Sequence, residues 1–87
     1  MVDETRLDGN AIAGELRQIF GVEMTDHLGC CGECGTVNRV AAITVYRTGP
    51  GDVLRCPNCE AVLFVLVQRD STVTVGFDSI RWLRMAR

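Results

Sequence analysis

Five cysteines carry most of the chemistry that this sequence of 87 residues could perform. Three lie in "GCCGECGTV" and two in "LRCPNCEA". Cys31 and Cys34 enclose two residues, as do Cys56 and Cys59, and 21 residues separate the two pairs. Two residues between thiolates allow a tight turn to aim both sulfurs at one ion, and two such turns complete a tetrahedron with arms of about 2.3 Å. The spacing therefore predicts a structural site for one zinc ion (Zn2+) per chain, bound by these four cysteines.

The residues beside these thiolates suit two tight turns. Gly32 and Gly35 permit the positive φ and the close backbone approach that let amide N–H groups point at sulfur. Pro57 sets the φ of the second turn in advance. Glu60 occupies the place that Gly35 has in the first turn. We therefore expect a different backbone conformation there and a less regular second turn, with no ligand lost.

Cys30 and His27 are the other residues that could contribute a ligand. A pair of Cys30 and Cys34 would enclose three residues, a less usual spacing, so we expect Cys30 to be an ordinary small side chain, with a reactive thiol as the alternative. His27 precedes Cys31 by four residues and could replace a sulfur. Because four better-spaced thiolates are available, we expect neither Cys30 nor His27 to bind the ion.

Paired cysteines also support two other kinds of chemistry. A redox dithiol normally opens a helix in a βαβ unit, where the helix dipole lowers the pKa of one thiol, whereas both pairs here precede β-rich segments. A catalytic zinc keeps one position open for water, and four thiolates leave none. The sequence has a single histidine and no evident serine–histidine constellation. We therefore expect a binding protein rather than an enzyme.

Length and composition indicate one small domain over residues 1–87. A chain of this size buries roughly 60–65% of its extended surface, so its stability is small without a staple such as a metal. The longest apolar run, 61–67, is far shorter than the ~20 residues of a membrane helix, so no membrane partner is expected. The opening "MVDE" lacks the apolar stretch of a signal peptide, which predicts reduced thiolates in the cytoplasm.

An amphipathic helix is predicted at 7–21. Its apolar stripe, at positions i, i+4, i+7 and i+8, consists of Ile12, Leu16, Ile19 and Phe20. Asp8 or Asn10 can accept backbone hydrogen bonds at its start, and Gly21 can end it in the left-handed conformation. The stripe cannot be buried by the helix alone, so we expect it to dock on a sheet.

The rest of the chain is predicted to form an antiparallel sheet. Strands are expected at 37–47, 53–55, 61–69 and 73–77, with turns at 48–52 and 69–72. The run 61–69 is apolar without alternation, as is typical of a strand covered on both faces. The tail 79–87 fits a strand or a helical turn, and we favour a strand.

The segments "CGECG" and "CPNC" resemble the knuckles of zinc ribbons, small β-hairpin domains that two cysteine pairs close around a metal. With "LDGN", "FG" and "LRCPNC", most of the chain is also similar to a family of short, uncharacterised bacterial proteins, which implies a structural zinc and no established activity. Rubredoxin-like iron sites for electron transfer share the two knuckles, but Glu60 and the few aromatic residues depart from that pattern. The resemblance implies a small α+β domain with a zinc-ribbon sheet of about three to four strands over 29–87.

Two classes of partner are compatible with this fold. The run 61–67 exceeds what one short helix covers, and small sheets leave strand edges open, so we expect a protein-interaction or adaptor module; a homo-oligomer is also compatible. The alternative is nucleic-acid binding, which needs clustered positive charge. The candidate clusters are Arg39, Arg47 and Arg55 on one hairpin face and Arg81, Arg84 and Arg87 in the tail. The net charge of −2 opposes this alternative.

Overall fold

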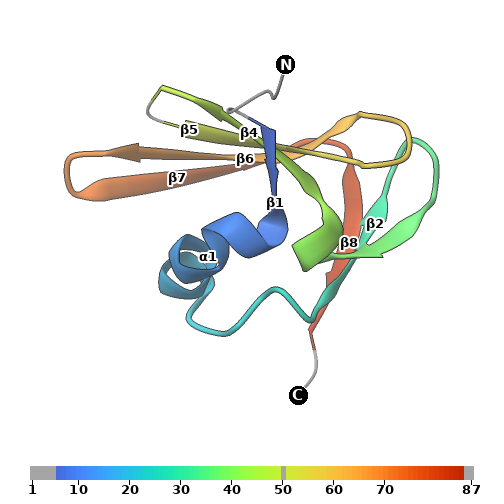
Figure 1. The fold of residues 1–87 in the computed structure, drawn as a ribbon, viewed down its shortest axis with the longest axis horizontal. Helices are drawn as coiled ribbons and strands as arrows, with labels where there is room; N and C mark the ends of the chain where they lie inside the picture. The colour runs from blue at the N-terminus through green and yellow to red at the C-terminus, as the bar shows by residue number, and fades with distance from the viewer. Residues whose placement is uncertain (1–5, 50, 86–87) are drawn as a thin grey trace.

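The computed structural model describes residues 6–49 and 51–85, which form two antiparallel sheets and one short α-helix (Figure 1). The five-stranded sheet has the order β1 (Arg6–Asp8), β4 (Thr44–Thr48), β5 (Gly51–Arg55), β6 (Val62–Arg69) and β7 (Thr72–Phe77). The three-stranded sheet has the order β3 (Val37–Arg39), β2 (Leu28–Cys31) and β8 (Ile80–Arg84). The small α+β class is confirmed. The prediction of three to four strands is wrong, because the larger sheet alone has five.

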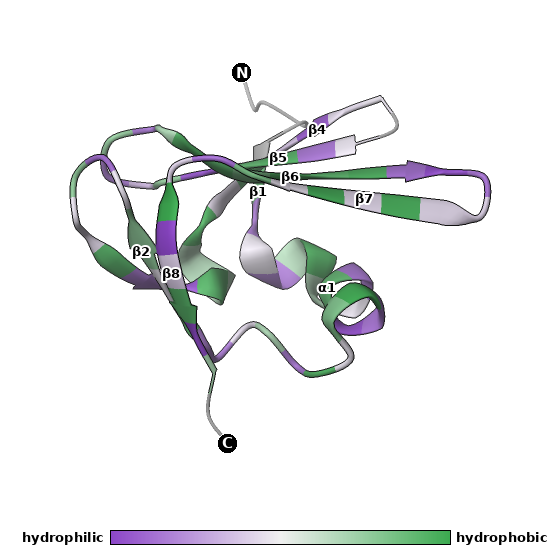
Figure 2. Cartoon of the chain, turned by 180° about the vertical axis from the view of Figure 1, so that it is seen from behind, coloured by the Kyte–Doolittle hydropathy of each residue, from purple (hydrophilic) through white to green (hydrophobic). Residues whose placement is uncertain are grey.

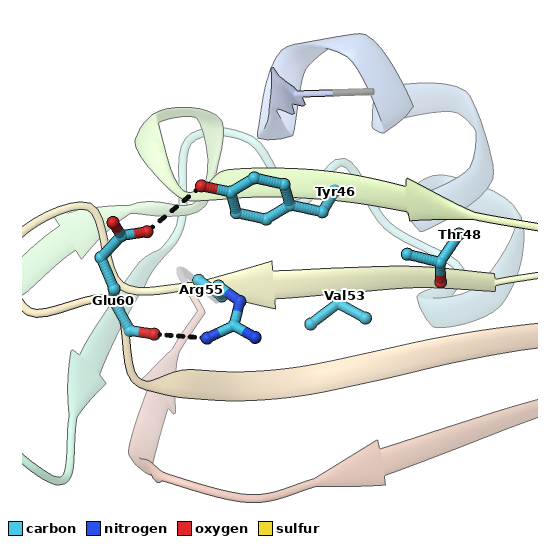
Figure 3. A pocket seen from close by; sticks show the side chains of 5 residues that line it. All are labelled: Tyr46, Thr48, Val53, Arg55 and Glu60. Carbon is cyan, nitrogen blue, oxygen red and sulfur yellow. Dashed lines mark hydrogen bonds between the residues drawn. The ribbon is translucent and has the colours of Figure 1, made fainter. Parts of the chain in front are cut away.

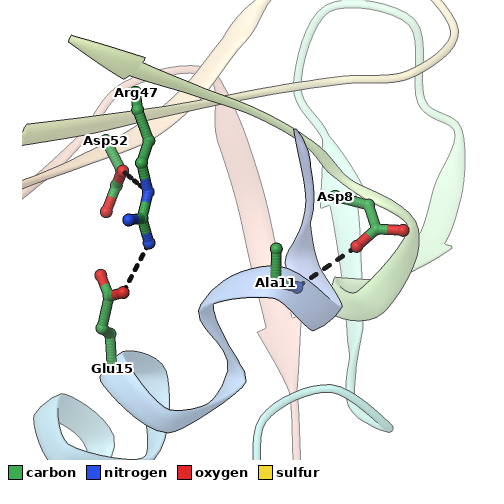
Figure 4. A network of polar contacts seen from close by, with 5 residues as sticks. All are labelled: Asp8, Ala11, Glu15, Arg47 and Asp52. Atoms are coloured by element: carbon green, nitrogen blue, oxygen red, sulfur yellow. Dashed lines mark hydrogen bonds and ion pairs between the residues drawn. The ribbon is translucent and has the colours of Figure 1, made fainter. Parts of the chain in front are cut away.

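The helix is shorter than the predicted range 7–21. Residues Arg6–Asp8 form β1, which pairs with β4, because Leu7 packs on the core in register with Val45. A 3-10 turn, η1 (Gly9–Ile12), follows, and the α-helix α1 covers Ala13–Phe20. Asp8 caps the 3-10 turn by accepting the Ala11 N–H at 3.3 Å (Figure 4). Gly21 ends α1 in the left-handed conformation, with φ 77°, as predicted.

The apolar stripe of α1 docks on the five-stranded sheet as expected. Ile12 and Leu16 are buried, and Ile19 and Phe20 pack against the same core. The strands contribute the inner face of the sheet, defined by Val45, Leu54, Phe64 and Leu66. Met24, from the connection between α1 and β2, is also fully buried, which its irregular sequence context did not indicate. No helix in residues 6–49 and 51–85 is long and apolar enough to cross a membrane.

A charge cluster joins α1 to the sheet beside this core. Arg47 on β4 lies between Glu15 of α1, with Nη2 at 2.6 Å from Oε1, and Asp52 of β5, with Nε at 3.2 Å from Oδ1 (Figure 4). Burial raises the pKa of Asp52, Glu15 raises it further, and the Arg47 charge opposes both. The polar side of the short helix is thereby held to the same strands that its apolar side covers.

The strand β6, which lies between β5 and β7 in the larger sheet, has two unequal faces. Figure 2 shows most of its length coloured as hydrophobic, which agrees with the predicted strand at 61–69. Phe64 and Leu66 on the inner face are fully buried, whereas Val65 and Val67 are only half-buried. Val53 pairs with Val65, and Tyr46 pairs with Val53, so these residues and Val67 define the outer face. The expectation of a strand covered on both faces is therefore wrong for the outer face.

The predicted strand at 37–47 is two strands in different sheets. β3 ends at Arg39, a 3-10 turn, η2 (Val40–Ala42), follows, and β4 begins at Thr44. Val40 is fully buried, so the turn carries apolar surface into the core while the chain passes from the smaller sheet to the larger. The β-branched residues on both sides of this turn favour strands, which is why the pattern did not reveal the break.

Candidate metal centre

Two turns with the same backbone hydrogen bonds hold the paired cysteines. In the first knuckle, after β2, Cys31 N–H donates to Thr36 O at 3.0 Å, and Gly35 N–H donates to Cys31 O at 2.9 Å. In the second knuckle, after β5, the equivalent bonds run from Cys56 to Ala61 and from Glu60 to Cys56, both at 2.9 Å. The chain thus builds the same turn twice, at the ends of strands from two different sheets.

Each knuckle also aims an amide N–H at its first sulfur. Glu33 N lies 3.4 Å from Cys31 Sγ, and Asn58 N lies 3.4 Å from Cys56 Sγ. Donors of this kind favour the thiolate, the form that binds metals. Gly32 N–H donates to Ser79 O at 2.5 Å, and a Cβ at Gly32 would lie 2.8 Å from that oxygen. Gly32 therefore makes a close backbone approach, but to Ser79 rather than to a sulfur, and this contact ties the first knuckle to the segment before β8. The predicted positive φ is found at Gly35 and not at Gly32.

The four paired cysteines lie together. Their sulfurs are all within 4.8 Å of one another, with Cys31 and Cys59 at 3.6 Å and Cys34 and Cys56 at 3.7 Å. A regular tetrahedron with metal–sulfur arms of about 2.3 Å has edges of about 3.8 Å. Cys31 and Cys56 are buried and Cys34 and Cys59 are exposed, so the cluster lies at the surface. The four sulfurs could therefore hold one thiophilic metal ion such as zinc.

Thr36 and Asn58 surround the exposed Cys34. The Asn58 side-chain amide donates to Cys34 Sγ at 3.5 Å and to Thr36 Oγ1 at 3.1 Å, and the Cys34 thiol donates to the same Thr36 oxygen at 3.1 Å. These bonds, with Asn58 first, lower the pKa of Cys34 to about 5. Sequence reasoning missed both residues, although a polar side chain two positions after Cys34 was a usable signal.

Cys59 is also exposed, but its pKa is shifted in the opposite direction from that of Cys34. The Ala61 N–H lowers its pKa, but desolvation and the contacts with Cys31, Cys34 and Cys56 together outweigh that donor and raise the pKa of Cys59 to about 12. A cluster of four sulfurs without a cation cannot carry four negative charges, so one member is a thiolate and another keeps its proton. A divalent ion removes this conflict, because its charge lets all four sulfurs deprotonate.

Glu60 does not have the different backbone conformation that we expected. Its φ of 66° lies beside the 76° of Gly35, so both knuckles have the same left-handed residue. Tyr46 donates its hydroxyl to Glu60 Oε1 at 3.2 Å, and Arg55 Nη1 donates to the Glu60 carbonyl oxygen at 2.9 Å (Figure 3). The second knuckle is therefore as regular as the first, and neighbouring side chains hold a residue that is not glycine in place.

Cys30 and His27 lie outside the cluster of four. Cys30 is buried with an exposed fraction of 6%, and its Sγ lies 3.7 Å from the carbonyl oxygens of both Cys31 and Gly35. His27 precedes β2, roughly 13 Å of strand from Cys31 at the usual rise per residue. These positions are consistent with the predicted ligand set, and the binding of the metal itself remains a prediction.

The predicted arginine cluster on one hairpin face is wrong. Arg47 points to the inner face and Arg55 to the outer face, while Arg39 lies in the smaller sheet. Pairing across β2 instead places Arg39 and Arg84 on either side of Leu28. Arg84 also lies over the Trp82 ring, 4.5 Å from its centroid. Arg87 is outside the described residues.

Comparison with known proteins assigns the chain to a family. A family model described as "Family of unknown function (DUF6510)" matches residues 3–87, so the chain belongs to that family. Neither the curated proteins nor the solved structures gave a match. The resemblance to zinc ribbons therefore rests on the two knuckles, because the family that matches is described only as one of unknown function.

Proposed function

We propose that this member of the DUF6510 family is a zinc protein of the reducing cytoplasm, in which a structural ion holds two sheets together so that the larger sheet can bind another protein. The observation that carries the proposal is the cluster of four cysteine sulfurs within 4.8 Å. Its ligands come from the ends of β2 and β5, strands of different sheets. An ion bound there would cross-link the two sheets.

A structural role follows from the composition of the site. Four thiolates occupy every position of a tetrahedral ion, so no position stays open for water or substrate. The apparent binding energy of structural zinc, ~10–16 kcal/mol in small peptides, is comparable with the whole stability of a domain, about 5–15 kcal/mol. We therefore propose that Zn2+ stabilises the fold and takes no part in a reaction.

The outer face of the larger sheet supports the protein-binding part of the proposal. Val53, Val65 and Val67 are half-buried there, and a pocket of about 500 Å³ opens on the same face beside the second knuckle. Val53 and Tyr46 supply its apolar lining, and Arg55 and Glu60 line it as well (Figure 3). An apolar and aromatic floor with a charged rim is typical of the centre of a protein interface.

Nucleic-acid binding is the second candidate, and one observation favours it. Arg39 and Arg84 flank Leu28 on the smaller sheet, and Trp82 stacks with the Arg84 guanidinium. Aromatic rings and guanidinium groups together bind unpaired bases. The net charge of −2 weakens phosphate attraction, so we rank this candidate below protein binding.

Metal analysis of freshly purified protein tests the first part of the proposal. One zinc per chain and little iron is the expected result; a red, visibly absorbing protein would instead indicate a rubredoxin-like iron site. The proposed site would be contradicted by a metal content well below one ion per chain. The protein used must have fully reduced thiols and must never have been exposed to a chelator.

Binding experiments test the second part. Immobilised wild-type protein and a Ser71→Ala control in the β6–β7 turn should retain the same partner, whereas Val53→Asp should lose it. A fluorescent single-stranded DNA or RNA probe provides the contrast. If the probe binds in a salt-dependent way and Arg84→Ala removes the binding while Val53→Asp does not, the nucleic-acid candidate replaces protein binding.

A further inference from the structure

β7 is an edge strand without the usual protection. In the part of the chain that the structure describes, it pairs with β6 on one side and with no strand on the other (Figure 1). Its sequence, "TVTVGF", contains no charged residue and no proline. Soluble proteins normally protect such edges with lysine, proline, a bulge or a covering segment, because the free backbone groups pair readily with another strand.

The odd-numbered residues of β7 carry these free backbone groups. Just beyond the strand, Asp78 N–H donates to Leu63 O at 2.9 Å, so the even-numbered residues point their N–H and C=O groups toward β6. In an antiparallel pair this direction alternates along the strand. Val73, Val75 and Phe77 therefore direct their backbone donors and acceptors outward.

The same three residues bring apolar side chains to the edge. Val73 and Phe77 are 48% and 58% exposed, and they lie on the inner face of the sheet with the half-buried Val75. Phe77 has one aromatic neighbour on that face, Phe64, with ring centroids 5.9 Å apart. Free hydrogen-bonding groups and exposed apolar side chains thus coincide at two positions that lie symmetrically about Val75.

We propose that β7 pairs antiparallel with β7 of a second copy of this chain, with Val75 on the two-fold axis. In this register Val73 of each copy lies opposite Phe77 of the other, so each exposed valine covers an exposed aromatic ring. All outward backbone groups of the three residues pair, which gives about six ladder hydrogen bonds across the axis. The two five-stranded sheets become one continuous sheet.

Symmetry is the reason to assign the edge to a second copy rather than to an unrelated peptide. An isologous contact needs a surface that complements itself, and the spacing of Val73 and Phe77 about Val75 meets that condition. The charges agree with it. Arg69 pairs with Thr72 within the chain, and the proposed register places Asp78 of the second copy on the far side of Thr72. Opposite charges therefore flank both ends of the contact.

The sedimentation of purified, zinc-loaded protein over a concentration series tests the register. The wild type should be a dimer that dissociates on dilution. Val73→Lys and Phe77→Glu should each raise the dimer dissociation constant at least about tenfold, because each buries an unpaired charge against an apolar side chain. The double variant should dimerise again, since the introduced lysine of one copy then faces the introduced glutamate of the other.

Val22→Lys is the matched control, because Val22 is 45% exposed but lies far along the chain from β7. It should dimerise like the wild type, and all variants should keep their zinc and their circular dichroism. The proposal is overturned by a wild type that stays monomeric throughout the series, by single variants that dimerise normally, or by a double variant that stays monomeric. A monomer whose β7 amides shift only with an added extended peptide would assign the edge to another partner.

Discussion

Gly35 and Glu60 have the same place in the two cysteine knuckles, and both adopt the left-handed backbone, with φ 76° and 66°. Glycine does so freely, whereas a residue with a Cβ is strained there by about 1–2 kcal/mol. Glu60 stays in this conformation because its N–H donates to Cys56 O, its carbonyl oxygen accepts from Arg55, and its carboxylate accepts from Tyr46. The strained residue lies between the cluster of four cysteines and the pocket on the outer face.

This equivalence predicts that two substitutions of Glu60 differ in their effect on stability. Glu60→Gly and Glu60→Ala both remove the carboxylate that accepts from Tyr46, but only Glu60→Gly relieves the left-handed strain. We expect the glycine variant to be more stable than the alanine variant by about 1 kcal/mol, measured by chemical denaturation of the zinc-loaded protein. Gly35→Ala should lose a similar amount relative to wild type. Equal stabilities of the two Glu60 variants would show that the backbone there is not strained.

Serine replacement of each cysteine tests the assignment of ligands. Loss of Cys31, Cys34, Cys56 or Cys59 should lower bound zinc and the melting temperature sharply, because the proposed structural ion would contribute a large part of the stability. Cys30→Ser should keep its zinc and lose at most a few kcal/mol, the cost of placing a hydroxyl in a buried site. If Cys30→Ser lost zinc while Cys31→Ser kept it, the first ligand pair would be Cys30 and Cys34.

The two exposed thiols should differ in reactivity once zinc is removed by a chelator. The pKa of Cys34 is lowered to about 5, so its thiolate predominates above that pH, whereas the pKa of Cys59 is raised to about 12 and its thiol persists through neutral pH. Iodoacetamide at neutral pH should therefore alkylate Cys34 first, as read by peptide mass spectrometry, and the rate should fall as the pH drops below about 5.

Asn58→Ala provides the control for this difference. It removes the donor that contributes most to the lowered pKa of Cys34, so alkylation of Cys34 in mildly acidic buffer should slow while Cys59 is unchanged. Retained secondary structure in the zinc-free protein must accompany the measurement. Equal rates for the two cysteines in a folded zinc-free protein would contradict the hydrogen-bonding pattern around Cys34.

The docking of α1 predicts that truncating a buried side chain of the helix lowers the unfolding free energy strongly, whereas truncating an exposed one hardly changes it. Leu16 is fully buried against the sheet, so Leu16→Ala should cost about 2–5 kcal/mol of unfolding free energy. Gln18→Ala, on the exposed side of the same helix, should change it by less than about 0.5 kcal/mol. Urea denaturation of both zinc-loaded variants measures the difference, and a tolerated Leu16→Ala would show that the helix is not docked.

Local features were the ones that the amino-acid pattern predicted well. The cysteine pairs, the end of α1 at Gly21, the strand at 61–69 and the turn after it each depend on residues a few positions apart. Such features are set by backbone preferences and by side-chain periodicity, which a single sequence displays directly. The start of the helix was missed, because β1 exists only through its pairing with the distant β4.

The sequence by itself therefore determined the donor set, since two tight turns with two cysteines each are local structures. Only the tertiary structure decided how the turns meet and what surrounds them. The break at η2, the separate sheet around β2 and the left-handed Glu60 depend on partners far away in the chain: the buried core around Val40, the pairing with β8, and the side chains of Tyr46 and Arg55. Residue preferences alone would exclude an unfavourable local conformation such as the left-handed φ of Glu60. Long-range contacts of this kind supply the stabilisation that offsets its cost.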